Sequence, residues 1–391
     1  MKIRMTKINR IDEKIAGGKN MDKWSVEKAN DWSKKQGWLR GFNYRPADCR
    51  NSVEIFQEYG FTDHLPLMES EFALAASIGF NTMRLVNSCE VWRDQHDGYM
   101  ARLEKIIELA YKSGIKTMLS FGNDCCPPKS LFVPVVYGPQ PLDLGYHGGV
   151  KNTPHKSYGE AGYNPFVDEP DGRRNLIAMT KEIVKRYADD ERVVVLDIFN
   201  EPGNGRRGSM SLDAMREMFA AARNENPIQP LTAGIWSYDI DFEKGELYFT
   251  GNCGEIQQAA LDLSDVISYH DYGIFTRSAA LIKVLKNKYN RPLFNTEWLN
   301  RIQNNSIFDQ YPLMMAEKVN CYCWGLVAGK SQTFEPWESM WQSVENGTAP
   351  KEWDLTKWMH DLFRISHRPY DPEEIELIKR INVFADAVYK P

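Results

Sequence analysis

No stretch of the sequence is apolar over the roughly 20 residues that a membrane-spanning helix needs. Residues 1–7 are charged and lack the apolar core of a signal peptide, so we expect a cytoplasmic protein. The seven cysteines follow no regular framework, and neither Cys125–Cys126 nor the Cys321/Cys323 pair has the CxxC spacing of a zinc site. These absences argue against a disulfide-rich secreted module and predict free thiols, no metal and no cofactor.

The sequence also lacks an excess of charge of one sign. Its 48 Lys and Arg residues are interspersed with 53 Asp and Glu residues, which gives a net charge of −5. Nucleic-acid binding needs a cluster of cations, so we expect no nucleic-acid partner and no membrane partner. Linkers rich in Gly and Ser are absent as well. The sequence therefore predicts a mobile arm at 1–23 and a single domain over 24–391.

Apolar and aromatic side chains, in contrast, are abundant. Hydrophobic residues make up 42% of the 391 residues, which is enough to build a large core. Aromatic residues reach 12%, with 11 Trp and 18 Tyr. Many of them must pack helices against a sheet, but the surplus suits a cleft that stacks flat, partly apolar ligands such as sugar rings.

Two short apolar stretches end in a glutamate. Residues 193–202 read Val-Val-Val-Leu-Asp-Ile-Phe-Asn-Glu-Pro, a strand buried on both faces that must stop at Pro202 and leaves Glu201 at its tip. Residues 292–298 form a similar run that ends at Glu297 and Trp298. Two such carboxylates indicate acid–base or nucleophilic chemistry on a bond between them. The alternative is that each one caps a helix or pairs with an arginine.

Strand-like and helix-like segments alternate along the whole chain, which is the pattern of a single (β/α)8 TIM barrel with a helical extension at its N-terminus. Ser25 is the expected N-cap of that extension at 26–36. The expected strands are 38–44, 81–86, 115–121, 193–202, 231–235, 265–270, 292–298 and 320–325. The expected helices that follow them include 68–78, 99–113, 173–187, 211–222, 278–285, 312–318 and a closing helix at 355–363.

One connection, 122–170, is too long for an ordinary turn between a strand and its helix. It is rich in Pro and Gly and contains several Tyr and His residues. It leaves from the end of the third strand, where active sites of such barrels lie. We therefore predict that it forms a wall or lid over the site, the alternative being a disordered surface insertion.

Polar side chains stand at or just after the ends of several expected strands. Because the C-terminal ends of parallel strands meet at one face of a barrel, we expect these side chains to converge there. They are Arg84, Asn87, Asn123, Asp124, Asn200, Glu201, His270, Tyr272, Glu297 and Trp324, with Lys330 and Gln332 just beyond the eighth strand.

The ordered set of Arg84, Asn200–Glu201–Pro202, His270-x-Tyr272, Glu297 and Trp324 resembles the retaining glycoside hydrolases of clan A, and family 5 most closely. The resemblance covers about 38–363. It implies that Glu201 is the acid/base and Glu297 the nucleophile, with no metal or cofactor. The histidine that family 5 commonly carries near the third strand has no match here, because Asn123–Asp124 stand in its place.

The chemistry of glycoside cleavage gives each remaining residue an expected role. Arg84 would keep Glu297 ionised, while burial and the neighbouring carboxylate would raise the pKa of Glu201. Tyr272 would donate to Glu297, and Trp324 would stack under the sugar. The further expected substrate contacts are Asn200 at the 2-hydroxyl, His270 at Glu201 or a hydroxyl, and Asp124 and Lys330 at hydroxyls.

Each of these residues also has a purely structural interpretation. Arg84 would be a buried ion pair, His270 and Trp324 part of the core, Asp124 a loop cap and Lys330 a solvated charge.

The resulting hypothesis is a retaining β-glycosidase that acts on the ends of short β-linked oligosaccharides of manno, gluco or xylo configuration. A transglycosylase would use the same covalent intermediate. A carbohydrate-binding pseudoenzyme is the alternative from a different class, and the presence of both Glu201 and Glu297 argues against it.

Overall fold

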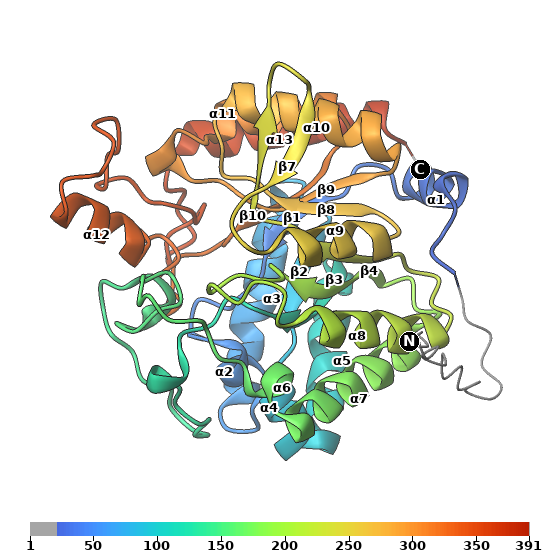
Figure 1. Cartoon of the computed structure of the whole chain (residues 1–391), viewed down its shortest axis with the longest axis vertical. Helices are drawn as coiled ribbons and strands as arrows, with labels where there is room; N and C mark the ends of the chain where they lie inside the picture. The colour runs from blue at the N-terminus through green and yellow to red at the C-terminus, as the bar shows by residue number, and fades with distance from the viewer. Residues whose placement is uncertain (1–21, 391) are drawn as a thin grey trace, which may run out of the picture.

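The computed structural model describes residues 22–390, which form a barrel of eight parallel strands surrounded by helices (Figure 1). The predicted arm at 1–23 lies almost entirely outside the described residues. Neighbouring strands follow the order β5-β4-β3-β2-β1-β10-β9-β8, and a bridge between Ile235 and Tyr269 joins the two outer strands. The barrel strands are β1 (Arg40–Asn43), β2 (Thr82–Val86), β3 (Lys116–Asn123), β4 (Val193–Asn200), β5 (Leu231–Gly234), β8 (Ile267–His270), β9 (Leu293–Trp298) and β10 (Asn320–Trp324). The predicted (β/α)8 fold is confirmed.

Helices cover the outside of the barrel and connect its strands. They are α1 (Val26–Gln36), α2 (Ser52–Phe56), α3 (Phe61–Ser77), α4 (Cys89–Asp94), α5 (His96–Lys112), α6 (Pro165–Asp168), α7 (Pro170–Tyr187), α8 (Leu212–Asn224), α9 (Gly254–Leu263), α10 (Phe275–Tyr289), α11 (Ile307–Ala316), α12 (Glu338–Glu345) and α13 (Pro372–Val388). A small hairpin, β6 (Tyr238–Asp241) and β7 (Glu246–Phe249), is inserted after β5. Within 22–390, none of the helices has the length and apolar character needed to cross a bilayer.

Strand β4 shows why the apolar runs form the barrel. All eight of its residues are buried, which is expected for a parallel strand with side chains inside the barrel and helices outside it. Leu196, Ile198 and Phe199 belong to the main core that the barrel shares with its helices. Val194 and Val195 belong to a second cluster with Met118 of β3 and Phe294 of β9.

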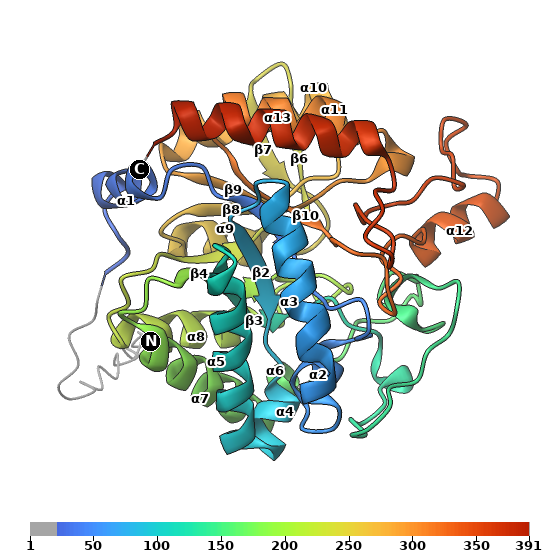
Figure 2. The ribbon, with the colours of Figure 1, turned by 180° about the vertical axis from the view of Figure 1, so that it is seen from behind.

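Helix α1 packs near one end of the barrel, and residues 122–170 and α12 lie at the opposite end (Figures 1 and 2). Ser25 caps α1 as expected, accepting a hydrogen bond from the backbone N–H of Lys28. Trp32 of α1 lies 6.2 Å from the ring of Phe294, and Trp24, just before the helix, joins the same cluster. The N-terminal helix therefore adds apolar cover to the barrel at the end away from the active-site loops.

The expected closing helix at 355–363 is wrong, because this segment contains no helix and the closing helix is α13. Met359 instead packs with Ile302 and Met340, and the ring Nδ1 of buried His360 bonds to the carbonyl of Leu299. Tertiary packing of these buried side chains outweighs the local helical pattern. Asp371 caps α13 by accepting from the backbone N–H of Glu373.

Asp265 ties α1 to the barrel, and its replacement tests this packing. The buried carboxylate accepts hydrogen bonds from the backbone N–H groups of Trp24 (2.9 Å) and Leu231 (2.8 Å) and pairs with Arg223 (2.9 Å). Asp265→Asn keeps the shape but leaves the guanidinium without its counter-charge, so we expect the free energy of unfolding to fall by about 3 kcal/mol. Urea denaturation followed by circular dichroism measures this. The control is Asp262→Asn on the exposed face of α9, and equal stability of the two variants would contradict the prediction.

Candidate active site

The C-terminal ends of the strands open into a cavity of about 730 Å³. Seven of the nine predicted site residues line it, namely Arg84, Asn200, Glu201, His270, Tyr272, Glu297 and Trp324. The 122–170 connection contributes several further lining residues, among them His147, Thr153 and His155. The structure therefore places this connection as a wall of the cavity.

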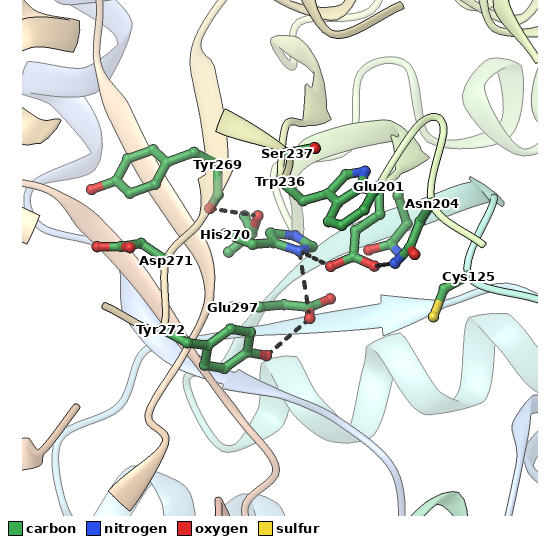
Figure 3. A network of polar contacts seen from close by, with 12 residues as sticks. Cys125, Glu201, Asn204, Trp236, Ser237, Tyr269, His270, Asp271, Tyr272 and Glu297 are labelled. Carbon is green, nitrogen blue, oxygen red and sulfur yellow. Dashed lines mark hydrogen bonds and ion pairs between the residues drawn. The ribbon is translucent and has the colours of Figure 1, made fainter. Parts of the chain in front are cut away.

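His270 lies between the two strand-tip carboxylates (Figure 3). Its Nδ1 is 2.7 Å from Oε1 of Glu201 and 3.5 Å from Oε2 of Glu297. The buried Nε2 has no hydrogen-bond partner, so a proton on Nδ1, which has a carboxylate acceptor, is the favoured arrangement. The ring is packed tightly, since a Cβ atom on Gly234 would lie 2.9 Å from Nε2. His270 therefore directs its Nδ1–H toward the carboxylates.

Each carboxylate has a further donor of its own. The hydroxyl of Tyr272 donates to Oε2 of Glu297 at 3.1 Å, as the sequence predicted. The side-chain amide of Asn204 donates to Oε2 of Glu201 at 2.5 Å. These contacts fix both carboxyl groups before any ligand arrives.

Glu201 occupies an unusual backbone conformation. Its φ of +46° lies in the left-handed region, which costs energy for a residue with a side chain. Side chains from other segments stabilise the turn that follows. The backbone N–H of Gly203 donates to Oδ2 of Asp124. The indole of Trp236 donates to the carbonyl of Pro202. This support keeps the Glu201 carboxylate at the mouth of the barrel.

Arg84 connects the floor of the site. Its Nη1 donates to Glu297 (2.9 Å) and Asn43 (2.8 Å), while Nε and Nη2 donate to Oδ2 of Asp197 (2.9 and 2.7 Å). Nη2 also donates to Oδ1 of Asn200 at 2.5 Å. The guanidinium is fully buried and therefore joins β1, β2, β4 and β9 below the two carboxylates.

The pKa values of the Glu201 and Glu297 carboxyl groups move in opposite directions. Burial raises the pKa of Glu297, and the charge of Glu201 adds to this against His270 and Arg84. Burial also acts to raise the pKa of Glu201, but hydrogen bonds from His270 and Asn204 outweigh it and leave that pKa lowered. The expected raised pKa at Glu201 is therefore wrong for the free protein, whereas Arg84 lowers the pKa of Glu297 as expected but less than burial raises it.

Two predicted ligands, Asp124 and Lys330, do not line the cavity. Asp124 is fully buried and binds Arg207 (2.8 Å) and Ser211 (2.6 Å). The ammonium of Lys330 pairs with Glu54 at 3.0 Å. Both side chains thus support the loops around the site, as the structural interpretation of Asp124 proposed.

Sequence reasoning missed several lining residues. Trp236 directly follows the fifth expected strand and Asn204 follows Pro202, so position relative to a strand end was a usable signal for both. Trp337 and His155 had no such signal. They stack on one another from distant parts of the chain, with ring centroids 5.5 Å apart.

The rings of His147, His155, Trp337 and His360 form an aromatic wall beside Tyr272. Burial lowers the pKa of His155 to about 4 and that of His360 to about 3, and it also lowers the pKa of His147. These rings are therefore uncharged near neutral pH. A neutral aromatic wall suits the apolar face of a sugar.

Two groups among residues 22–390 bring potential metal ligands together. One is Glu201, His270 and Glu297, but Arg84 already supplies a positive charge to Glu297 there. The other is Asp48, Cys49 and His64, where burial raises the pKa of the Cys49 thiol and disfavours the thiolate that metals need. Neither group offers a well-formed metal site.

Comparison with solved structures supports the fold. A family 5 enzyme (GH5_18) from Streptomyces cattleya in complex with GlcNAc is 12% identical, with a TM-score of 0.52 over 90% of this chain and 80% of that chain. The exo-β-1,4-mannosidase Op5Man5 from Opitutaceae bacterium strain TAV5 is 17% identical, with a TM-score of 0.53 over 90% of this chain and 60% of that chain. The β-1,4-mannanase from the sea hare Aplysia kurodai is 14% identical, with a TM-score of 0.51 over 80% of this chain and 90% of that chain.

The sequence itself matches a family model. No curated protein sequence matches the chain, but a family model does. The family described as "Cellulase (glycosyl hydrolase family 5)" matches residues 51–339, which include the ends of β2, β4, β8, β9 and β10 that carry the site. Because this match covers well over half of the sequence, the chain belongs to glycosyl hydrolase family 5.

Proposed function

We propose that this protein is a retaining β-glycosidase in which Glu201 is the acid/base and Glu297 is the nucleophile. The observation that carries this is their spacing, since the facing oxygens of Glu201, Glu297 and the Nδ1 of His270 lie within 4.8 Å of one another. Retaining enzymes hold their carboxyl groups roughly 5–5.5 Å apart, whereas inverting enzymes leave room for a water between them.

The contacts around each carboxylate support a double displacement. Glu297 would attack the anomeric carbon while Glu201 protonates the departing oxygen, and a water activated by Glu201 would then release the sugar. Arg84 and Tyr272 orient the attacking carboxylate through two hydrogen bonds. Trp324, which lines the cavity, would form the floor under the cleaved sugar.

The proton of the pair must lie on Glu201 when the reaction begins. In the free protein the hydrogen bonds from His270 and Asn204 favour the ionised form of Glu201 and lower its pKa. A glycosidic oxygen placed beside Glu201 accepts a hydrogen bond from the protonated acid and thereby stabilises the protonated form.

The substrate we propose is a short β-linked oligosaccharide, cleaved from its end. Residues of the aromatic wall and of the 122–170 connection line the cavity, and we propose that they block the path of a longer polymer. His155 and Ser339 bond across this wall through the backbone at 2.9 Å, so it is a packed structure. One structural neighbour is named as an exo-β-1,4-mannosidase, which is compatible with this proposal.

The first prediction concerns the catalytic pair. Glu297→Ala should abolish hydrolysis of aryl β-glycosides. Glu201→Ala should slow substrates with poor leaving groups by about 10²–10⁴-fold and activated aryl substrates much less, because these need little protonation. Azide should partly rescue Glu201→Ala and give a β-glycosyl azide, identified by NMR. Glu338→Ala, outside the cavity lining, is the control. An α-glycosyl azide or an active Glu297→Ala protein would refute the assignment.

The second prediction concerns pH. The Nδ1–H of His270 favours the ionised form of both carboxyl groups, so His270→Phe should raise both of their pKa values. A raised pKa at the nucleophile moves the acidic limb of the kcat/KM profile to higher pH, and a raised pKa at the acid does the same to the alkaline limb. Tyr269→Phe is the control, because the Tyr269 phenol points away from both carboxyls (Figure 3). A shift to lower pH would contradict the hypothesis.

The third prediction concerns the mode of cleavage. On a labelled ladder of β-linked oligosaccharides, the products should be single sugars released one at a time from the non-reducing end. Replacing both Trp337 and His155 by Ala removes the stacked pair of the wall and should allow some internal cleavage. Chromatography of early time points measures both. A spread of internal fragments from the unaltered enzyme would show that it acts within chains.

A further inference from the structure

Two arginines line the cavity without a carboxylate partner. Arg45 lies two residues beyond the end of β1, and Arg50 follows in the loop to α2. Both side chains are partly buried. Arg45 makes one hydrogen bond to described residues, from Nη1 to the carbonyl of Arg50 at 3.3 Å. The buried Nε of Arg50 has no partner at all within 22–390.

The other arginines around the site are paired. Arg84 binds Asp197 and Glu297, and Arg277 binds Asp271. Four arginines line the cavity. Within 22–390, Arg45 and Arg50 are the two of them that form no ion pair with a carboxylate. Burial and the nearby Arg50 lower the pKa of Arg45 to about 10, so Arg45 remains charged at neutral pH. Guanidinium groups in general stay protonated in proteins.

Two of the carboxylates whose charge acts on Arg50 already have other partners. Glu54 pairs with Lys330, and Asp143 accepts from the backbone N–H of Lys151. Asp361 is only partly engaged: Oδ2 accepts from the hydroxyl of Thr333, while the buried Oδ1 has no hydrogen-bond partner within 22–390. Its charge acts to raise the pKa of Arg45, but it forms no ion pair with that guanidinium among the described residues. Two adjacent guanidinium groups with unmet donors in a substrate cavity are the arrangement expected where an anion binds.

The positions of Arg45 and Arg50 in the barrel indicate on which side of the scissile bond they lie. The end of β1, Asn43, lies in register with Trp324, the proposed floor of the cleaved sugar. The proposed acid Glu201 follows β4, three strands away from β1 across β2 and β3. Because the acid must face the leaving group, Arg45 and Arg50 lie toward the glycone, the sugar that is released.

We propose that the glycone carries an anionic group and that Arg45 and Arg50 bind it. This inference rests on the proposed glycosidase function and names its substrate class. The carboxylate of a terminal uronic acid and a phosphate ester on the primary carbon share the required chemistry. The planar guanidinium donates two parallel hydrogen bonds to either group, which a neutral hydroxymethyl group cannot accept in the same way.

Binding to the Glu201→Gln protein tests this without depending on turnover. The probes are methyl β-D-glucuronide, β-D-mannuronide and β-D-galacturonide, the three matching neutral methyl glycosides, and the corresponding 6-phosphates, titrated by calorimetry. We expect at least one anionic probe to bind at least tenfold more tightly than its neutral match. The uronide and phosphate arms then show which anion is preferred.

Variants of Arg45 test whether the two arginines cause the preference for anionic probes. Arg45→Gln should weaken binding of the preferred anion on the order of 10- to 100-fold and weaken its neutral match less. Arg45→Lys, which keeps the charge, should restore part of the loss. Arg216→Gln on the exposed face of α8 is the control for the change in net charge.

Neutral probes that bind as tightly as every anionic probe would overturn the inference, as would equal losses for both classes in Arg45→Gln. Binding of no anionic probe would overturn it as well. Turnover by the unaltered enzyme separates the two proposals. Cleavage of neutral aryl β-glycosides alone would support hydrolysis and refute the anionic glycone, whereas anion-selective binding without cleavage would do the reverse.

Discussion

The buried guanidinium of Arg84 is the interaction on which the site depends. It donates to side chains from β1, β4 and β9, so a shift of any of these strands would break charged hydrogen bonds of a fully buried cation. Asp197 shares the charge and leaves one of its own oxygens, Oδ1, unpaired. Arg84 thus joins two acids, Asp197 and Glu297, and the hydrogen bond from its guanidinium helps to set the position of Glu297.

Much of the barrel could be predicted from the sequence because parallel strands buried on both faces leave continuous apolar runs. The run at β4 and the polar residues at the strand ends placed Glu201, His270 and Glu297 in one cavity. The helix expected at 355–363 failed because Met359 and His360 turn inward to contacts that lie far away in the sequence. Local periodicity carries no information about such contacts.

Electrostatics was harder to predict for a related reason. A strand-end position shows that a carboxylate reaches the mouth, but its pKa depends on donors from other elements. Asn204 and His270 reverse the effect of burial at Glu201. The contact with His270 was expected as one of two alternatives, but the contact with Asn204 and the direction of the pKa shift were not. In the same way, Asp124 stands at a strand end but is engaged by Arg207, which lies more than 80 positions along the chain.

The position of α1 has a consequence for how the chain acquires its structure. Trp24 and Asn30 bond to residues more than 240 positions later, and β1 pairs with β10. The N-terminal elements therefore have no complete partner until nearly the whole chain has left the ribosome, and their contacts carry a high loop-closure cost. Barrel closure and docking of α1 are expected to come late in folding, after the central strands β2, β3 and β4 have paired with neighbours that are closer in sequence.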